Sequence, residues 1–152
     1  MIEVKVKKLH KDAKIPFKKF DRDFCYDVVA TSCEEIAPQV YKYGIGLAFE
    51  IDTKESQDAK DDGMRLSLDF RPRSSVWQTG MVLSNCEGTI DELYRGGVSA
   101  VFYHVLPNMP KYEVGDKIGQ IKLGITVAIE WHEVEDLSDT ARGSDGYGST
   151  GK

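Results

Sequence analysis

Apolar and polar residues alternate over much of this chain, and this period-two pattern restricts it to a β-rich fold. Ile2, Val4 and Val6 alternate with charged residues, and the same alternation runs from Met64 to Phe70. Successive side chains of a strand point to opposite faces, so the pattern predicts strands that are buried on one side. Further strand-like runs, rich in β-branched and aromatic residues, occur at 43–51, 80–85, 97–106 and 117–135.

No long amphipathic helix is expected. The one short helical candidate is 73–80, which follows Pro72 and closes at Gly80, a residue suited to the position just after a helix. Residues 52–63 are interpreted as a solvated acidic loop that joins two strands and needs no function. Many short strands separated by turn residues predict an all-β sandwich, barrel or jelly roll in one domain.

The chain is acidic overall, which limits its partners. Its 152 residues carry a net charge of −5, so a general attraction for nucleic acid or a membrane surface is not expected, and a phosphate-bearing ligand would need a local basic site. We find no apolar run of membrane-spanning length and no signal-peptide core, so a cytoplasmic protein without a membrane or nucleic-acid partner is expected. The three cysteines and three histidines are scattered, which argues against a disulfide framework or a zinc site.

The final segment, "ARGSDGYGSTGK" at 141–152, is rich in glycine. Its last seven residues match the start of a phosphate-binding P-loop, but the hydroxyl residue and helix that the motif requires do not follow Lys152. Glycines still allow successive backbone amides to converge on an anion. Taken alone, the segment is a solvent tail, a cloning remnant or an arm that folds over a phosphate.

Two polar segments are candidates for binding. "RPRSS" at 71–75 places two arginines and two serines where a strand meets the short helix, which suits an oxyanion or phosphate. The alternative is that Ser74 or Ser75 only caps the helix. In "CYDVVA" at 25–30, Asp27 interrupts a strand-like run. Its carboxylate is either a Mg²⁺ site acting through water or a satisfied edge residue.

A third candidate is the segment 80–98, "GMVLSNCEGTIDELYRGGV". Two strand-like runs flank a turn-like "CEG", and we expect a hairpin whose backbone groups can read the flat edge of a base. Asp91 lies in an apolar neighbourhood that suits a general base at the edge of a cleft. Its alternative role is that of a turn or bulge carboxylate.

Together these segments resemble a known family. "RPRSS", "GTIDELYRG", "GDKIGQI" and "ARGSDGYGSTG", in this order and at these distances, are similar to motifs two to five of the trimeric dUTP pyrophosphatases, and "CYDVVA" resembles motif one. The likeness covers nearly the whole chain. It implies a jelly-roll-like β domain with one short helix over 1–140, assembled as a homotrimer with active sites at its interfaces. It also implies that 141–152 is a mobile arm that closes over nucleotide bound at a neighbouring subunit.

The resemblance implies a role for each site residue. Asp91 would be the general base that orients the attacking water, and Asp27 would lie near a Mg²⁺ ion held by the triphosphate and by waters. Tyr94 would pack on the deoxyribose, and Arg142 would meet the γ-phosphate. The residues implied in substrate binding are Arg73, Ser74, Ser75 and Gln120 for the phosphates, Asn85, Gly88, Ile90 and Tyr94 for the nucleoside, and Arg142, Tyr147, Gly148, Ser149 and Thr150 in the arm.

The reaction implied is the Mg²⁺-assisted hydrolysis of dUTP to dUMP and pyrophosphate, which limits uracil incorporation into DNA and supplies dUMP for thymidylate synthesis. Five residues depart from the family pattern, namely Cys25, Tyr26, Leu93, Gly97 and Asp145, and they bear on rate and metal affinity rather than on reaction type. Two alternatives remain open at this stage. One is a dCTP deaminase-like enzyme of the same fold, and the other is a non-catalytic trimer that binds nucleotide or a regulatory protein.

Overall fold

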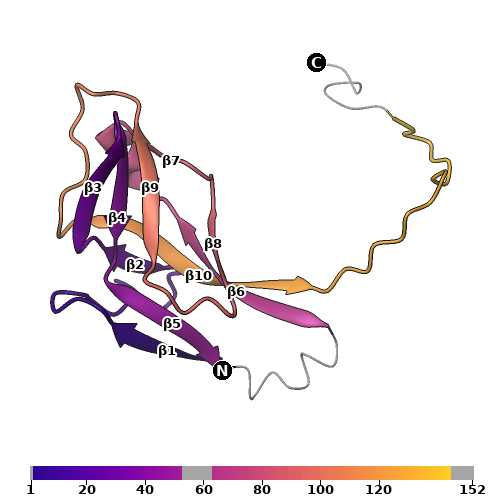
Figure 1. The fold of residues 1–152 in the computed structure, drawn as a ribbon, viewed down its shortest axis with the longest axis horizontal. Coiled ribbons are helices and arrows are strands. Elements are labelled where there is room, and N and C mark those ends of the chain that lie inside the picture. The colour runs from indigo at the N-terminus through magenta and orange to yellow at the C-terminus, as the bar shows by residue number, and fades with distance from the viewer. Residues whose placement is uncertain (1, 53–62, 145–152) are drawn as a thin grey trace.

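The fold is built almost wholly from β-strands (Figure 1). The computed structural model describes residues 2–52 and 63–144, and the acidic loop predicted at 52–63 falls almost entirely outside them. One short 3-10 helix interrupts the strands. In chain order the elements are β1 (Glu3–Lys8), β2 (Tyr26–Val29), β3 (Ser32–Ala37), β4 (Val40–Gly44), β5 (Leu47–Asp52), β6 (Met64–Arg71), η1 (Ser74–Thr79), β7 (Met81–Leu83), β8 (Gly88–Asp91), β9 (Ser99–His104) and β10 (Lys117–Val127).

The strands form three antiparallel sheets. The β10 sheet has the order β2-β10-β6-β8, the β9 sheet has the order β3-β4-β9-β7, and β1 pairs with β5 alone. β10 is the longest strand, and it pairs with β2 through its first half and with β6 through its second half. The all-β class predicted from the alternation is therefore confirmed, and most pairings join strands that are far apart in the sequence.

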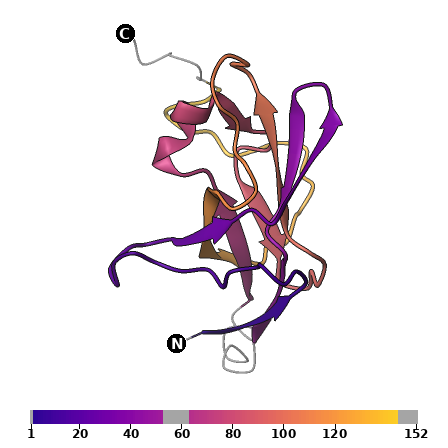
Figure 2. The same cartoon turned by 90° about the vertical axis from the view of Figure 1, so that its left-hand side faces the viewer.

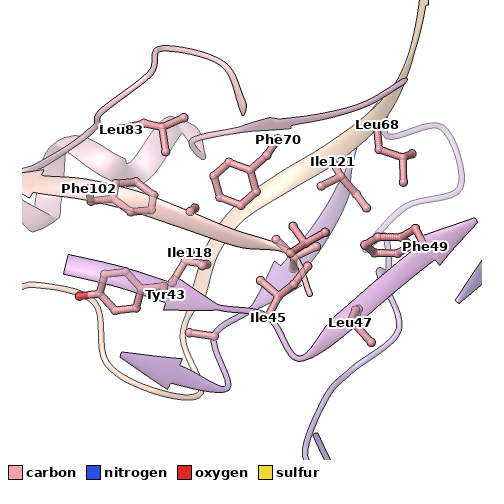
Figure 3. Packing of buried hydrophobic residues seen from close by; sticks show 14 of the residues in the cluster. Tyr43, Ile45, Leu47, Phe49, Leu68, Phe70, Leu83, Phe102, Ile118 and Ile121 are labelled. Carbon is pink, nitrogen blue, oxygen red and sulfur yellow. The ribbon is translucent and has the colours of Figure 1, made fainter. Parts of the chain in front are cut away.

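The core lies between the sheets and is lined by the apolar side of each alternating strand (Figure 3). Tyr43, Leu47, Phe102 and Ile118 are essentially inaccessible to solvent. The rings of Tyr43 and Phe102 meet edge to face with their centroids 5.9 Å apart, and the hydroxyl of Tyr43 donates to the carbonyl of Tyr112 at 2.8 Å. This hydrogen bond lets a phenol be buried without an unsatisfied polar group.

Two local predictions are confirmed, namely the alternation at 64–70 and the short helix at 73–80. The polar and apolar residues of β6 separate onto two faces, with Leu66, Leu68 and Phe70 buried. The short helix forms and ends at Gly80, whose φ of 61° lies in the left-handed region that favours glycine. No helix in the described ranges is long and apolar enough to cross a membrane. The run at 117–135 is a strand only as far as Val127.

The hairpin predicted at 80–98 is wrong. β7 pairs with β9 and β8 pairs with β6, so the two strands belong to different sheets. Burial decides this arrangement, because Met81 and Leu83 face the core from the β9 sheet while Ile90 packs against it from the β10 sheet. The turn between the two strands therefore connects the sheets instead of closing a hydrogen-bonded ribbon.

The outer face of the β10 sheet is polar and contains a mostly buried ion pair. Lys122 of β10 donates to Asp69 of β6, and the hydroxyl of Ser67 donates to the same carboxylate at 2.8 Å. Burial alone would raise the pKa of Asp69, but the hydrogen bonds from Lys122 and Ser67 outweigh it and lower the pKa below its ordinary value. Ser67 lies directly across the ladder from Asp91, so the pair borders one of the predicted site residues.

We predict that Asp69→Asn destabilises the protein by about 3–5 kcal/mol near neutral pH, because it leaves the charge of Lys122 buried without its partner. A carboxyl whose pKa is lowered by folding stabilises the protein above its unfolded-state pKa of about 3.9, and this contribution is lost as the pH falls through the folded-state pKa. Urea unfolding at pH values from neutral down to about 3, at one protein concentration, measures the difference.

The difference in unfolding free energy between wild type and Asp69→Asn should narrow in the acidic steps. Asp139 is exposed, so Asp139→Asn is the matched control and should follow the wild type throughout. An Asp69→Asn deficit that stays constant down to the lowest pH would contradict the lowered pKa.

Candidate functional site

A polar cavity of about 400 Å³ lies where the start of β10, the chain leaving β6 and the loop before β2 come together. The predicted residues Asp27, Arg73, Ser74 and Gln120 all line it. They come from three segments that are far apart in the sequence, and the fold brings them to one place. The remaining lining residues are Phe17, Lys18, Lys19, Phe20, Asp23, Phe24, Cys25 and Lys117.

The carboxylate of Asp27 binds two cations in this cavity. Nε of Arg73 donates to Oδ1 at 3.1 Å, and Nζ of Lys117 donates to Oδ2 at 2.8 Å. The Asp27 side chain is only 16% exposed, so its charge needs these partners. Asp27 and Gln120 are also directly opposite each other in the β2–β10 ladder. The ion pairs thus fix the two cations at the wall of the cavity.

The cavity is positively charged although the chain is acidic. Lys18, Lys19, Arg73 and Lys117 line it together with only two carboxylates, one of which is Asp27. This leaves an excess of two positive charges in a chain whose net charge is −5. Such a local reversal of sign attracts anions and raises their concentration at the cavity.

The short helix contributes to the same wall. Arg73 is its N-terminal cap residue and makes no side-chain capping hydrogen bond, so the alternative in which Ser74 or Ser75 caps the helix is wrong. Ser74 is exposed and lines the cavity, whereas Ser75 is not among the lining residues. Nε2 of Gln120 donates to the carbonyl of Pro72 at 3.4 Å, so β10 contacts the "RPRSS" segment directly.

The remaining predicted residues surround β8. Two cavities of about 200 Å³ each adjoin there and share Thr89, Ile90 and Ser99. Asp91 and Tyr94 line the first cavity, and Asn85 and Gly88 line the second. Neither cavity is lined by a lysine or arginine within the part of the chain that the structure describes. Asp91 is the one charged side chain that lines them among the described residues, so they lack the positive charge that an anion would need, and we refer to the two as the β8 cavities.

A tight turn after β8 holds the ring of Tyr94. The backbone N–H of Tyr94 donates to the carbonyl of Asp91 at 3.0 Å, and its hydroxyl donates to the carbonyl of Gly97 at 3.1 Å. A Cβ on Gly96 would clash with that hydroxyl, so the glycine of "YRG" allows the ring to fold back over the chain. Asp91 itself is exposed at the end of β8.

The positively charged cavity and the β8 cavities lie on different parts of one chain. β2 and β8 are the two edge strands of the β10 sheet, and three strand spacings separate them by about 14 Å. Among residues 2–52 and 63–144, no residue lines both groups of cavities. Arg142 is exposed in the segment beyond β10. The predicted arm residues Tyr147, Gly148, Ser149 and Thr150 lie outside the described residues.

Comparison with known proteins assigns the family. The family model described as dUTPase matches residues 69–151, which is more than half of the chain. This chain belongs to the dUTPase family. A dUTPase named deoxyuridine 5'-triphosphate nucleotidohydrolase, from Nautilia profundicola, is 33% identical over 153 residues and is matched over 99% of this chain and 100% of its own length. The protein of the same name from Helicobacter pylori is 32% identical, with 99% of this chain and 97% of its own length covered.

Solved dUTPase structures share the fold. The dUTPase of Staphylococcus bacteriophage 80alpha, solved as a mutant with dUpNHpp, superposes with a TM-score of 0.76 at 22% identity and covers 99% of both chains. A dUTPase from phage phi11 of S. aureus superposes with a TM-score of 0.66 at 19% identity over 91% of this chain. At these identities the superpositions establish a common architecture. They confirm the jelly-roll-like dUTPase fold predicted from the motifs.

The motif resemblance missed three cations of the charged cavity. Lys117 lies within the quoted "GDKIGQI", but nothing local signals its ion pair with a carboxylate 90 residues away. Lys18 and Lys19 lie in a loop before β2 that no motif covers. Their signal in the sequence is the dense "FKKF" pairing of lysines with aromatics, which is unusual in an acidic chain.

We predict that Asp27→Asn destabilises the protein by about 1–2 kcal/mol, a value between those of exposed and buried ion pairs. Arg73 and Lys117 would then face each other without a shared counter-charge. Adding Lys117→Met to Asp27→Asn should recover part of the loss, giving a coupling energy of at least about 0.5 kcal/mol. The coupling energy is measured by chemical unfolding of the wild type, both single variants and the double variant. Purely additive effects would show that the carboxylate does not bridge the two cations.

Proposed function

We propose that this protein hydrolyses dUTP to dUMP and pyrophosphate, and that in doing so it limits uracil incorporation into DNA and supplies dUMP for thymidylate synthesis. The observation that carries the proposal is the segregation of charge between its cavities. The cavity with Arg73, Ser74 and Gln120 has an excess of positive charge, whereas no lysine or arginine of the described residues lines the cavities with Asn85 and Tyr94. A nucleoside triphosphate has the matching division between a polyanion and an uncharged nucleoside.

Asp91 acts in this proposal as the general base. Its carboxylate is exposed at the rim of a cavity that Tyr94 also lines, so it can hold a water next to a bound nucleoside. The water oxygen attacks the α-phosphorus while a proton of the water passes to Asp91. The bond between the α-phosphorus and the oxygen that bridges it to the β-phosphate then breaks, and pyrophosphate leaves with that oxygen. Arg73 and the other cations of the charged cavity offset the charge that develops on the departing pyrophosphate.

Specificity for deoxyuridine resides in the β8 cavities. Asn85 and the backbone of the turn before β8 supply polar groups that suit the edge of uracil, and a mismatched base would leave such groups unpaired. Tyr94 packs against the sugar, where its ring leaves no room for a 2′-hydroxyl. Gly88 and Ile90 line the floor beneath the base.

The separation of the two groups of cavities supports a homotrimer in which neighbouring chains complete each site. In Figure 1 the chain after β10 runs away from the body. Exposed apolar side chains occur along it, including Ile129, Trp131 and Leu137. A partner subunit would cover these side chains, since removing their apolar surface from water would stabilise the assembly. The residues at 141–152 would then form an arm over the neighbour's nucleotide, with Arg142 and Tyr147 to Thr150 as ligands.

Mg²⁺ fits this site as a cofactor that takes most of its ligands from substrate. No cluster of three or more metal-binding side chains occurs among the described residues. Mg²⁺ commonly uses one or two carboxylates together with substrate phosphates and waters. Asp27 is the available carboxylate, and it keeps acceptor capacity beyond its two ion pairs. When bound, Mg²⁺ would neutralise phosphate charge and polarise the phosphoryl oxygens.

The decisive test is pyrophosphate release from dUTP, dCTP, dTTP and UTP, with Mg²⁺ present and after chelation. Rapid release from dUTP alone, lost on chelation and restored by Mg²⁺, is expected. Ammonia release from dCTP would instead identify a deaminase of the same fold. A folded protein that binds dUTP but releases no pyrophosphate would contradict the proposed hydrolysis.

We predict that Asp91→Asn binds dUTP as tightly as the wild type but hydrolyses it about 10²- to 10⁴-fold more slowly, because the amide cannot accept the proton of the attacking water. Calorimetry with a non-hydrolysable imido analogue of dUTP measures binding, and single-turnover kinetics measure hydrolysis. Glu92→Gln is the matched control on the neighbouring carboxylate and should turn over normally. Near-normal turnover by Asp91→Asn would require another base.

A further inference from the structure

The loop between β1 and β2 is anchored to the charged cavity at its base. Phe17 and Asp27 form an isolated antiparallel bridge, in which the N–H of Phe17 donates to the carbonyl of Asp27 at 3.2 Å and the N–H of Asp27 donates to that of Phe17 at 2.7 Å. The loop projects from the body in Figure 2. Lys18 and Lys19 therefore follow directly after a residue that is hydrogen-bonded to Asp27, the carboxylate that binds Arg73 and Lys117.

A second set of hydrogen bonds closes the tip of the loop. The N–H of Asp23 donates to the carbonyl of Phe20 at 3.0 Å, and the N–H of Phe20 donates to Oδ2 of Asp23 at 3.1 Å. The carboxylate of Asp23 is thus used within the loop backbone. The Phe17–Asp27 bridge and the Phe20–Asp23 hydrogen bonds together restrict the loop to few conformations. The loop therefore holds its side chains at the rim of the cavity.

Both lysines line the cavity without a carboxylate partner. Nζ of Lys18 lies 4.2 Å from the centroid of the Tyr26 ring, and Nζ of Lys19 lies 5.2 Å from that of Phe20. Neither ammonium forms a salt bridge with any residue in the described ranges. A ring face attracts the charge but accepts few of the three N–H donors of an ammonium group. The remaining donors are available to an anion.

We propose that Lys18 and Lys19 are substrate-binding residues that contact the polyphosphate of the nucleotide. This inference rests on the proposed function and extends its phosphate site to a loop outside the motif residues. Lysines and an arginine line this cavity, whereas no lysine or arginine of the described residues lines the cavities with Asn85 and Tyr94, so the two lysines act on the polyphosphate and not on the nucleoside. Lysine suits this role as a flexible point charge that follows a phosphate chain.

The test uses Lys18→Met, Lys19→Met and the double variant, since methionine keeps an unbranched apolar side chain while removing the charge. Each single change should raise the KM for dUTP and the Kd for inorganic tripolyphosphate about fivefold, as expected for one partly exposed charge pair. Both effects should shrink as salt is added. Calorimetry with tripolyphosphate needs no turnover, so it tests the lysines even if dUTP proves not to be a substrate.

Three controls distinguish binding from damage to the loop. Lys8 is exposed on β1 and lines none of the cavities described above, so Lys8→Met should leave both constants unchanged. Lys18→Arg and Lys19→Arg should retain most of the affinity. Inhibition by deoxyuridine, which has no phosphate, should be the same in every variant. Unchanged tripolyphosphate affinity in the double methionine variant would overturn the proposal, as would an equal loss of deoxyuridine inhibition.

Discussion

The ion pairs of Asp27 with Arg73 and Lys117 are the interaction on which the charged cavity depends. Two cations that share one carboxylate can lie close together at a wall where they would otherwise repel each other. The carboxylate also belongs to a strand whose backbone anchors the preceding loop, so one residue sets the positions of cations from three segments. A chain with a net charge of −5 thereby presents one local site with the opposite sign.

The second organising feature is the division of the binding surface into a positively charged part and a part without lysine or arginine among its described lining residues. β6 links them, because it pairs with β10 on one side and β8 on the other and then leads into η1. A rigid sheet cannot bend to bring its two edge strands together. In the proposed function a nucleotide that uses both parts is shared between two chains, so assembly becomes part of the chemistry, and the exposed apolar segment beyond β10 is the surface that a neighbouring chain covers.

The sequence predicts the strands well because the alternation of apolar and polar residues matches the alternation of buried and exposed side chains. Leu66, Leu68 and Phe70 face the core where the pattern places them. Alternation does not show which strand pairs with which. It therefore cannot show that β7 pairs with β9 and β8 with β6 instead of the two forming a hairpin. The motifs correctly group Asp27, Arg73, Ser74 and Gln120, since relatives share their order along the chain. They cannot predict the contribution of the loop before β2, which depends on the conformation of that loop and on its long-range bridge to Asp27.

The position of β10 in its sheet also determines when the site can exist. β10 is the last strand in the part of the chain that the structure describes, yet it lies between β2 and β6 and provides most of their pairing. Contacts of such long sequence separation slow folding, and a ribosome-bound chain lacks this strand until the residues up to Val127 have been made. Until then β6 exposes an unpaired edge to other chains. The protein is thus most vulnerable to aggregation while it is being made. An anion that binds the completed cavity cannot reduce this risk, because it stabilises only the fully folded chain.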